Sequence, residues 1–337
     1  MQINFFIIFF FIILNTFFIY FFNKIKLFHH NLDKPDNKRK LHKKPIPLAG
    51  GTLIFLNLLF YSFFIFFNQN LLLKEVLFLN QLNFALFFLS CLAIFCLGFF
   101  DDRLNISAAF KFLITTIIIF LIIFFDKNLI LNQIKFSFFE RIFYLSEFSI
   151  LFTCFCFIVY LNAFNMFDGI NLQSFSYSLI IFFYIFIFHL DIILIQVLFI
   201  SLITFGYLNF KNKSFLGDSG SLLISFIISY IFIKLYNFNM INFADEIVIF
   251  MLIPGIDLIR LFLIRILNKR NPLSPDRLHL HHLLLSKFSY KETLIIIIIL
   301  ILLPIILNYL KLNNLYTIAL VILLYFSIFK IIKHKKS

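Results

Sequence analysis

Charged residues are scarce in this chain of 337 residues: they make up 13% of it, whereas 62% of the residues are hydrophobic and the mean hydropathy is +1.01. Such values lie far outside the range of soluble globular domains and exclude that class. Tryptophan is absent while Phe occurs 56 times. This bias follows the direction in which an AT-rich genome pushes codon usage, so we give it no functional weight. The composition predicts an integral membrane protein.

Cysteine is also rare, with four residues that all fall inside apolar runs: Cys91, Cys96, Cys154 and Cys156. Cys154 and Cys156 are two positions apart, so on a helix their side chains point roughly 200° apart. That geometry suits neither a shared metal nor a disulfide. We interpret all four as small packing residues.

Apolar runs separated by Asn, Lys and Asp give about eleven segments long enough to cross a hydrocarbon core of ~30 Å. We place them at 3–22, 47–67, 83–100, 108–125, 148–164, 174–189, 192–209, 219–236, 246–267, 293–308 and 315–332. The first lacks a basic start and a small-residue cleavage site, so we expect a retained anchor rather than a signal peptide. The sequence thus predicts an all-α, polytopic membrane protein in which residues 1–337 form one domain.

The basic residues are unevenly divided between the two sides of this predicted bundle. With the amino terminus outside, 23 of the 29 Lys and Arg residues fall on the cytoplasmic side. Basic residues near span ends favour the cytoplasm. We therefore expect an external amino terminus and a cytoplasmic carboxyl terminus.

Five polar segments fall on that cytoplasmic side. They are "KRKLHKKPIPLAGG" (38–51), "GFFDDRLNIS" (98–107), "NAFNMFDGINL" (162–172), "FLGDSGSLL" (215–223) and "SPDRLHLHHLLL" (274–285). Because five separate loops bring polar groups to one face, we expect the active site there.

Two pairs of charged residues lie at or within predicted spans. Asp101 and Asp102 are adjacent, and like charges 4 Å apart repel by ~4 kcal/mol at an effective dielectric near 20. A bound cation would remove that cost, although solvated charge at the headgroup level is the alternative. Asp257 and Arg260, one turn apart, are predicted to form a buried structural ion pair.

Two of the segments have patterns typical of helix ends, one at the end of a helix and one at the start of a helix. Asn162, Asn165 and Asp168 recur every three residues and form a polar stripe at the end of a helix, which Gly169 stops. Two glycines flank Asp218 at a helix start, where free backbone N–H groups favour phosphate or a metal-bound anion. Ordinary helix-end Asn residues and a plain N-cap turn are the alternatives.

Three histidines follow Pro275, a residue that can begin a helix. On such a helix His279 and His282 share a face with Asp276, while His281 lies between them. Zinc is compatible with these residue types, and interfacial histidines near headgroups are a simpler alternative. With carboxylates and phosphates nearby, a hard oxygen-ligated ion such as Mg²⁺ fits better.

Taken in order, the five segments resemble the polyprenyl-phosphate N-acetylhexosamine-1-phosphate transferase family, glycosyltransferase family 4. They are most similar to the bacterial undecaprenyl-phosphate GlcNAc-1-phosphate transferases. The resemblance implies transfer of GlcNAc-1-phosphate from a UDP-sugar to undecaprenyl phosphate in the bacterial inner membrane. The products would be undecaprenyl-diphosphate-HexNAc and UMP, at the first membrane step of a cell-surface glycan such as O-antigen.

The resemblance also implies roles for individual residues. Mg²⁺, with Mn²⁺ as an alternative, would be held by Asp218 with Asp101 and Asp102 beside it, and one of that pair would organise the cation or deprotonate the lipid phosphate. His279 joins them as a catalytic residue. The substrate-binding set comprises Lys44 next to Lys43, Asn162, Asn165, Asp168, Asn171, His281 and His282.

One departure from the family pattern affects the nucleotide side. The family usually has D-G-[LI]-D-G where this chain has Asp168-Gly169-Ile170-Asn171-Leu172. Asn171 keeps the size and one acceptor but lacks the charge, which leaves room for a related sugar.

Three alternatives stay open: a phospho-MurNAc-pentapeptide transferase, a lipid or sugar-lipid transporter, and a silent relative. We expect membrane lipid and no nucleic acid as partners, and leave a homodimer open.

Overall fold

The computed structural model describes residues 2–35, 44–68, 72, 75–190, 192–272 and 276–334. Its helices are α1 Gln2–Phe21, α2 Gly50–Phe67, α4 Gln81–Leu104, α5 Ala108–Phe125, α6 Ser149–Phe167, α7 Gln173–Phe188, α8 Ile193–Phe210, α9 Gly217–Asn237, α10 Ala244–Leu267, α11 Leu280–Leu285, α12 Tyr290–Tyr309 and α13 Asn314–His334. Each of the eleven expected spans coincides with one long helix. The expectation of a helical, polytopic membrane protein is confirmed.

In the described part of the chain, nine helices are long and apolar enough to cross a membrane. The two remaining long helices, α1 and α7, contain shorter apolar stretches, Phe5–Phe21 and Gln173–Phe188. Because a helix rises about 1.5 Å per residue, these nine helices of 18 residues or more match the thickness of a hydrocarbon core. The orientation of the bundle in a membrane stays a prediction.

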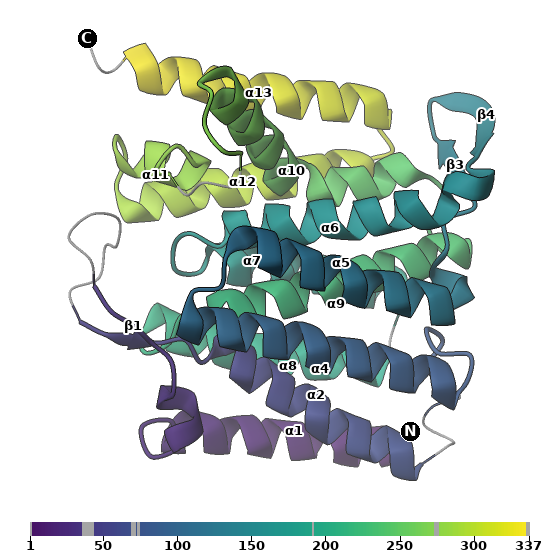
Figure 1. Cartoon of the computed structure of the whole chain (residues 1–337), viewed down its shortest axis with the longest axis vertical. Helices are drawn as coiled ribbons and strands as arrows, with labels where there is room; N and C mark the ends of the chain where they lie inside the picture. Colours follow the sequence, from purple (N-terminus) through teal and green to yellow (C-terminus); the bar gives the residue numbers. More distant parts are fainter. Residues whose placement is uncertain are drawn as a thin grey trace.

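Helix α9 lies at the centre of the bundle, with α4, α6 and α2 packed around it (Figure 1). Every residue from Ser219 to Tyr236 is buried. A helix that is apolar on all sides is stable only when neighbouring helices cover it completely. The central place of α9 therefore puts its polar amino-terminal end in the middle of one face of the bundle.

Two glycines allow α2 and α4 to approach the start of α9 closely. A Cβ atom on Gly51 would lie 2.3 Å from the backbone nitrogen of Gly220, and one on Gly98 would lie 2.5 Å from the Cα of Ser219. The Gly51 N–H also donates to the carbonyl of Leu216 at 3.0 Å. The "PLAGG" segment thus joins two helices, and its glycines serve close helix packing.

Two small antiparallel strand pairs lie at opposite ends of the bundle and were absent from the helical expectation (Figure 1). Leu32–Asp33 (β1) pairs with Ile46–Pro47 (β2), and Gln133–Phe136 (β3) pairs with Phe139–Tyr144 (β4). The residues of β4 are all exposed.

The four cysteines are free and either buried or half-buried. The interpretation of them as packing residues is consistent with this burial.

Candidate functional site

Four of the polar segments meet at the amino-terminal end of α9, and the fifth, the histidine segment, contacts the residue after Asp168 at the end of α6. The connecting contacts are Phe215 N–H to the Pro47 carbonyl (2.9 Å), Asp218 N–H to Asp102 (2.7 Å), Asn165 to Asp218 (2.9 Å), and the close approach of His281 to Gly169. Loops from widely separated parts of the chain thus form one polar site. The expectation that these loops share one face is confirmed by these contacts.

Asp102 caps helix α9 from a neighbouring helix. Its Oδ1 accepts from the backbone N–H of Asp218 at 2.7 Å, and its Oδ2 accepts from the N–H of Ser219 at 3.1 Å and from the Ser219 hydroxyl at 2.8 Å. Gly217 begins the helix at a φ of +75°, and a Cβ there would lie 2.7 Å from Asp102 Oδ2. Of the two alternatives at this helix start, an anion site and a capped turn, these bonds favour the cap, because a carboxylate of the chain accepts from both N–H groups.

Asp101 and Asp218 instead point at one cation, the ammonium of Lys111. The Lys111 Nζ lies 2.5 Å from Asp101 Oδ2 and 2.8 Å from Asp218 Oδ2. The Asp101 side chain is 6% exposed, whereas that of Asp218 is 35% exposed and can reach a ligand. Consecutive helical residues face different directions, so the adjacent aspartates 101 and 102 have separate tasks.

Lys111 was missed by the sequence interpretation. The signal for it is that Lys111 is the one charged residue of the otherwise apolar helix α5. A lysine in an apolar first turn implies a carboxylate partner, because an unpaired charge near hydrocarbon is costly. The sequence does not name that partner, since Asp218 lies more than 100 positions away.

The polar stripe on α6 is only partly directed at the site. The Asn165 amide donates to Asp218 Oδ1 at 2.9 Å and to the Ser221 hydroxyl at 2.8 Å. The Asn162 amide donates to the Ile158 carbonyl of its own helix at 2.7 Å. Helix α6 ends at Phe167, as the glycine that follows Asp168 predicted.

Asp168 lies at the carboxyl end of α6, near Asp218. Burial raises the pKa of its carboxyl to about 7; the hydrogen bond from Ser174 at 2.6 Å lowers the pKa and the charge of Asp218 raises it. A carboxyl with this pKa is partly protonated at neutral pH, so it can either donate or accept a hydrogen bond.

The histidine segment folds differently from the expected helix. Helix α11 begins at Leu280 with His279 at its N-cap, while Pro275 lies outside the described residues. Asp276 precedes the helix and accepts from the Arg265 guanidinium at 2.8 Å. The prediction that His279 and His282 share a helical face with Asp276 is therefore wrong. Arg265 and the Leu278 N–H, which donates to Asp276 Oδ1 at 2.8 Å, hold Asp276 outside the helix.

The predicted ion pair between Asp257 and Arg260 is confirmed, with 2.7 Å between Asp257 Oδ1 and Arg260 Nη2. The Arg260 guanidinium also donates to the Leu278 carbonyl at 2.6 Å, and His279 Nδ1 lies 3.4 Å from Asp257 Oδ2. The hydroxyl of Tyr325 on α13 donates to Asp257 Oδ1 at 2.5 Å. The pair therefore positions the histidine segment, a role that the sequence interpretation did not assign.

His281 is buried between its neighbours and the glycine that ends the α6 segment. A Cβ on Gly169 would lie 2.0 Å from the His281 ring, so this contact requires glycine. The ring centroid lies 4.3 Å from that of His282 and 5.4 Å from that of His279. Burial lowers the pKa of His281 to about 3, helped by the charges of His282 and His279, so the imidazole is neutral at pH 7. A neutral ring offers one donor and one acceptor.

The two remaining predicted residues lie at the edge of the site. The Asn171 amide donates to Asn212 Oδ1 at 2.6 Å and to the Asn209 carbonyl at 3.2 Å, so it connects two loops of the chain. Lys44 is exposed just before β2, and Lys43 lies outside the described residues. Contacts of Asn171 and Lys44 with a nucleotide stay predictions.

The arrangement of carboxylates bears on the predicted metal. Across the described residues, no three His, Cys, Asp or Glu side chains gather closely enough to hold a metal. The predicted set of three aspartates is therefore not formed, because Asp102 turns to α9. Asp101 and Asp218 do direct one oxygen each at a single position, which the Lys111 ammonium occupies. Since Mg²⁺ often binds through one or two carboxylates, with waters and phosphates as its other ligands, these two residues fit it.

A bundle of apolar helices with aspartates and a lysine gathered at one end defines a multi-pass membrane protein with a charged site at one boundary of the hydrocarbon layer. Residues 84–236 of the chain match the family model described as "Glycosyl transferase family 4". This range includes Asp101, Asp102, Lys111, Asn165 and Asp218. The match covers three of the five segments, 98–107, 162–172 and 215–223, and supports the family resemblance for these three.

Curated relatives agree with the family model. The chain is 26% identical over 299 residues to the undecaprenyl-phosphate alpha-N-acetylglucosaminyl 1-phosphate transferase of Escherichia coli K12, covering 84% of this chain and 77% of the relative. It is 28% identical over 268 residues to the protein of that name from Thermotoga maritima, covering 79% and 77%. The Yersinia pestis relative of that name is 27% identical over 288 residues, covering 79% and 73%.

Proposed function

We propose that this chain transfers an N-acetylhexosamine-1-phosphate, best GlcNAc-1-phosphate, from a UDP-sugar to undecaprenyl phosphate. The names of the relatives support the two substrates. The observation that carries the proposal is the convergence of Asp101 and Asp218 on the Lys111 ammonium. The Asp218 side chain in this cluster is 35% exposed. Such a site is built to manage the charge of phosphate groups at a membrane boundary.

The reaction joins two anions. A phosphate oxygen of the lipid attacks the sugar-linked phosphorus of the UDP-sugar, the bond to the bridging oxygen breaks, and UMP leaves with that oxygen. Catalysis of such a transfer depends on positioning and on neutralising phosphate charge. Mg²⁺ held by Asp101 and Asp218 would supply part of that neutralisation when bound.

The other residues of the site have distinct tasks in this proposal. Lys111 contributes positive charge next to the phosphates, and Asp102 holds the start of α9 in place. Asp168 and the neutral His281 ring offer hydrogen bonds to the nucleotide or sugar. His279, held by Asp257, donates to a phosphate oxygen.

The surface beside the aspartates suits a prenyl chain. Phe100 is 50% exposed and Leu104 is 66% exposed, one on each side of the two aspartates on α4. The facing start of α5 exposes Phe110. A prenyl tail in the bilayer can therefore lie against α4 while its phosphate reaches Asp218.

The direct test incubates purified protein with undecaprenyl phosphate and a panel of UDP-sugars and follows UMP release. We expect UDP-GlcNAc or a close UDP-HexNAc to be used, with activity lost in EDTA and restored by Mg²⁺ or Mn²⁺. Preference for UDP-MurNAc-pentapeptide would assign the chain to peptidoglycan synthesis instead. Absence of UMP release with every UDP-sugar of the panel would contradict the proposal and favour a transporter or a silent relative.

We also propose that the site faces the cytoplasm of a bacterium, with the protein in the inner membrane. The support is the distribution of basic residues. A cysteine placed in the carboxyl-terminal tail, after replacement of the native cysteines, should resist an impermeant reagent in intact cells. Its labelling there would overturn the orientation.

A further inference from the structure

A second polar cavity lies at the opposite end of α9 from the aspartates. It has a volume of about 300 Å³ and is formed by the end of α9, the turn after α5, and strand β3. Because α9 is 21 residues long, the two sites are about 30 Å apart. The cavity is thus separate from the proposed transferase site.

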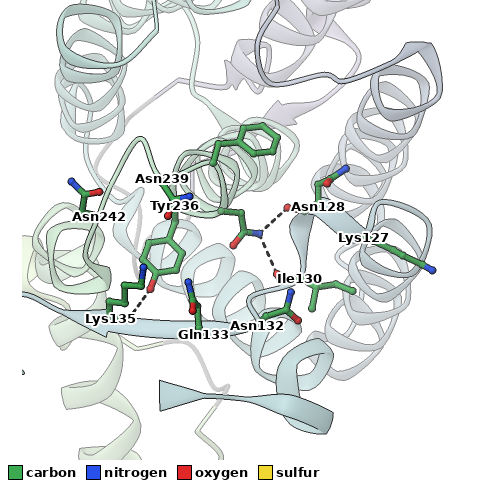
Figure 2. Close-up of a pocket in the computed structure, with 11 residues that line it drawn as sticks. Lys127, Asn128, Ile130, Asn132, Gln133, Lys135, Tyr236, Asn239 and Asn242 are labelled. Atoms are coloured by element: carbon green, nitrogen blue, oxygen red, sulfur yellow. Dashed lines mark hydrogen bonds between the residues drawn. The ribbon is translucent and has the colours of Figure 1, made fainter. Parts of the chain in front are cut away.

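The lining of this cavity is basic and rich in hydrogen-bond donors. The eleven residues around it include Lys127 and Lys135 and several Asn and Gln side chains, and none of the eleven is acidic. Figure 2 shows Lys135 beside the Tyr236 ring and Gln133 nearby, while the Lys127 ammonium points outward at the rim. An anion with further polar groups is the ligand that this lining would recognise.

Two carboxylates lie near the cavity, one in an ion pair and one buried with both oxygens hydrogen-bonded to the chain. Asp126 is buried against Lys234 at 2.7 Å. Asp245 accepts from the Ser137 N–H at 2.7 Å and from the Asn314 amide at 2.6 Å. The carbonyl end of α9, which disfavours anions, is largely occupied too: the carbonyls of Lys234, Leu235 and Tyr236 accept from residues 238–241.

The cavity is held open by the chain itself. The Asn237 amide donates to the Asn128 carbonyl at 2.7 Å and to the Ile130 carbonyl at 3.2 Å, which fixes the turn after α5 (Figure 2). On the other side, the Tyr236 hydroxyl accepts from the Lys135 N–H at 2.8 Å. This bond uses the main chain of Lys135 and not its ammonium.

The cavity also lies where a lipid headgroup would be. Phe124 and Phe125, 57% and 59% exposed, form the last turn of α5 just before Asp126 and Lys127. An apolar helix end followed two residues later by a lysine marks the boundary between hydrocarbon and headgroups. A volume near the lower limit for ligand sites suits a headgroup rather than a larger molecule.

We propose that this cavity binds the phosphate headgroup of an anionic phospholipid from the leaflet at that end of the bundle. Lys135 and the amides contact the phosphate and the headgroup hydroxyls, Lys127 attracts the headgroup at the rim, and the acyl chains lie along α5. The site does not depend on the proposed transferase reaction.

The test titrates purified protein in detergent with phosphatidylglycerol, phosphatidylcholine or glycerol phosphate and counts bound molecules by native mass spectrometry. We expect phosphatidylglycerol to bind at least 10-fold more tightly than either other probe. The variant K127Q/K135Q should lose at least 10-fold in that affinity, and Asn242→Ala should lose less. The matched control R141Q/K311Q removes two charges at the same end and should change the affinity less than 2-fold.

Three results would overturn the proposal. Equal affinity of K127Q/K135Q and the parent would show that the lysines do not bind the lipid. Equal binding of phosphatidylcholine would exclude selection of anionic headgroups. Glycerol phosphate binding as tightly as phosphatidylglycerol would exclude the lipid as the source of the phosphate. UMP release does not enter this measurement, so the test stands apart from the proposed function.

Discussion

The two ends of α9 handle charge in opposite ways. At its start, Asp218 shares the Lys111 ammonium with Asp101, and its side chain remains 35% exposed. Near its end, Lys234 and Asp126 form an ion pair 2.7 Å apart in which both side chains are fully buried. An exposed cluster with an excess of carboxylates can bind a cation or a ligand, whereas a closed pair of one acid and one base can only hold helices together.

The largest effect is expected from the closed pair. Lys234→Met leaves the Asp126 carboxylate buried without a cation, with only the hydrogen bonds from Asn128 and Tyr230, which should lower the free energy of unfolding by about 3–5 kcal/mol. The double variant D126L/K234M should recover most of that loss, because neither charge remains. Thermal denaturation in detergent measures the loss in the single variant and the recovery in the double variant. A single variant as stable as the parent would show that the pair does not support the fold.

A pH effect is expected from Glu75, at the same end as the closed pair. Burial raises the pKa of its carboxyl to about 7, while bonds from Tyr61 and from the N–H groups of Leu194 and Ile193 lower it. In the unfolded chain the pKa is near 4.5. The native state therefore binds more protons between these values, so stability falls as pH rises from about 4.5 to 7.

The full pKa difference corresponds to about 3 kcal/mol at most. Glu75→Gln keeps an acceptor for the two N–H groups and should flatten this part of the stability profile. Thermal midpoints at pH 5, 6, 7 and 8 check it. An unchanged slope in the variant would mean that another group titrates.

At the start of α9, substitution of the aspartates is expected to lower activity more than stability. Asp218→Asn or Asp101→Asn should lower turnover by 10²-fold or more, about 2.7 kcal/mol of transition-state stabilisation. UMP release measures the rate, and thermal midpoints should stay close to the parent value. Glu140→Gln, an exposed carboxylate on β4, is the control. Wild-type rates in both aspartate variants would contradict the mechanism.

His279 should contribute less. His279→Ala removes a donor that Asp257 holds in place, and we expect turnover to fall about 10-fold, or about 1.4 kcal/mol. His279→Gln restores a donor and should recover part of the rate. Equal loss in the two variants would indicate a packing role instead.

The smallest expected effect is a difference in the rate of UMP release between substitutions of two asparagines on α6. Asn165→Ala removes the amide that binds Asp218 and should slow UMP release several-fold. Asn162→Ala removes an amide that binds its own helix and should change the rate less than 2-fold. Equal effects of the two substitutions would mean that both residues contact the substrate.

Much of the fold was predictable because long apolar runs have few alternatives in a bilayer. Each span had to satisfy its own backbone, so eleven runs became eleven helices. The hairpin at 133–144 was missed because a short strand pair outside the spans leaves only a weak pattern in a Phe-rich chain. The start of α11 was misplaced because Arg265 binds Asp276 and holds it outside the helix.

The site was predictable as a set of segments but not as a set of contacts. Adjacent Asp101 and Asp102 look equivalent in the sequence, and only the packing of α4 against α9 turns one toward the helix start and the other toward Lys111. Lys111 itself stood out as a lone charge, yet its partners come from helices far away in the chain.

By itself, the sequence determined that the chain is a bundle of membrane-spanning helices and that five segments carry its polar chemistry. Local composition is enough for this, since hydrocarbon selects helices by length and hydropathy alone. Only the tertiary structure decided which carboxylates share a cation, which one caps α9, and where a second, basic cavity forms. Those outcomes depend on distances between side chains from different helices, and at the start of α9 close packing at Gly51 and Gly98 brings α2 and α4 near enough for these contacts.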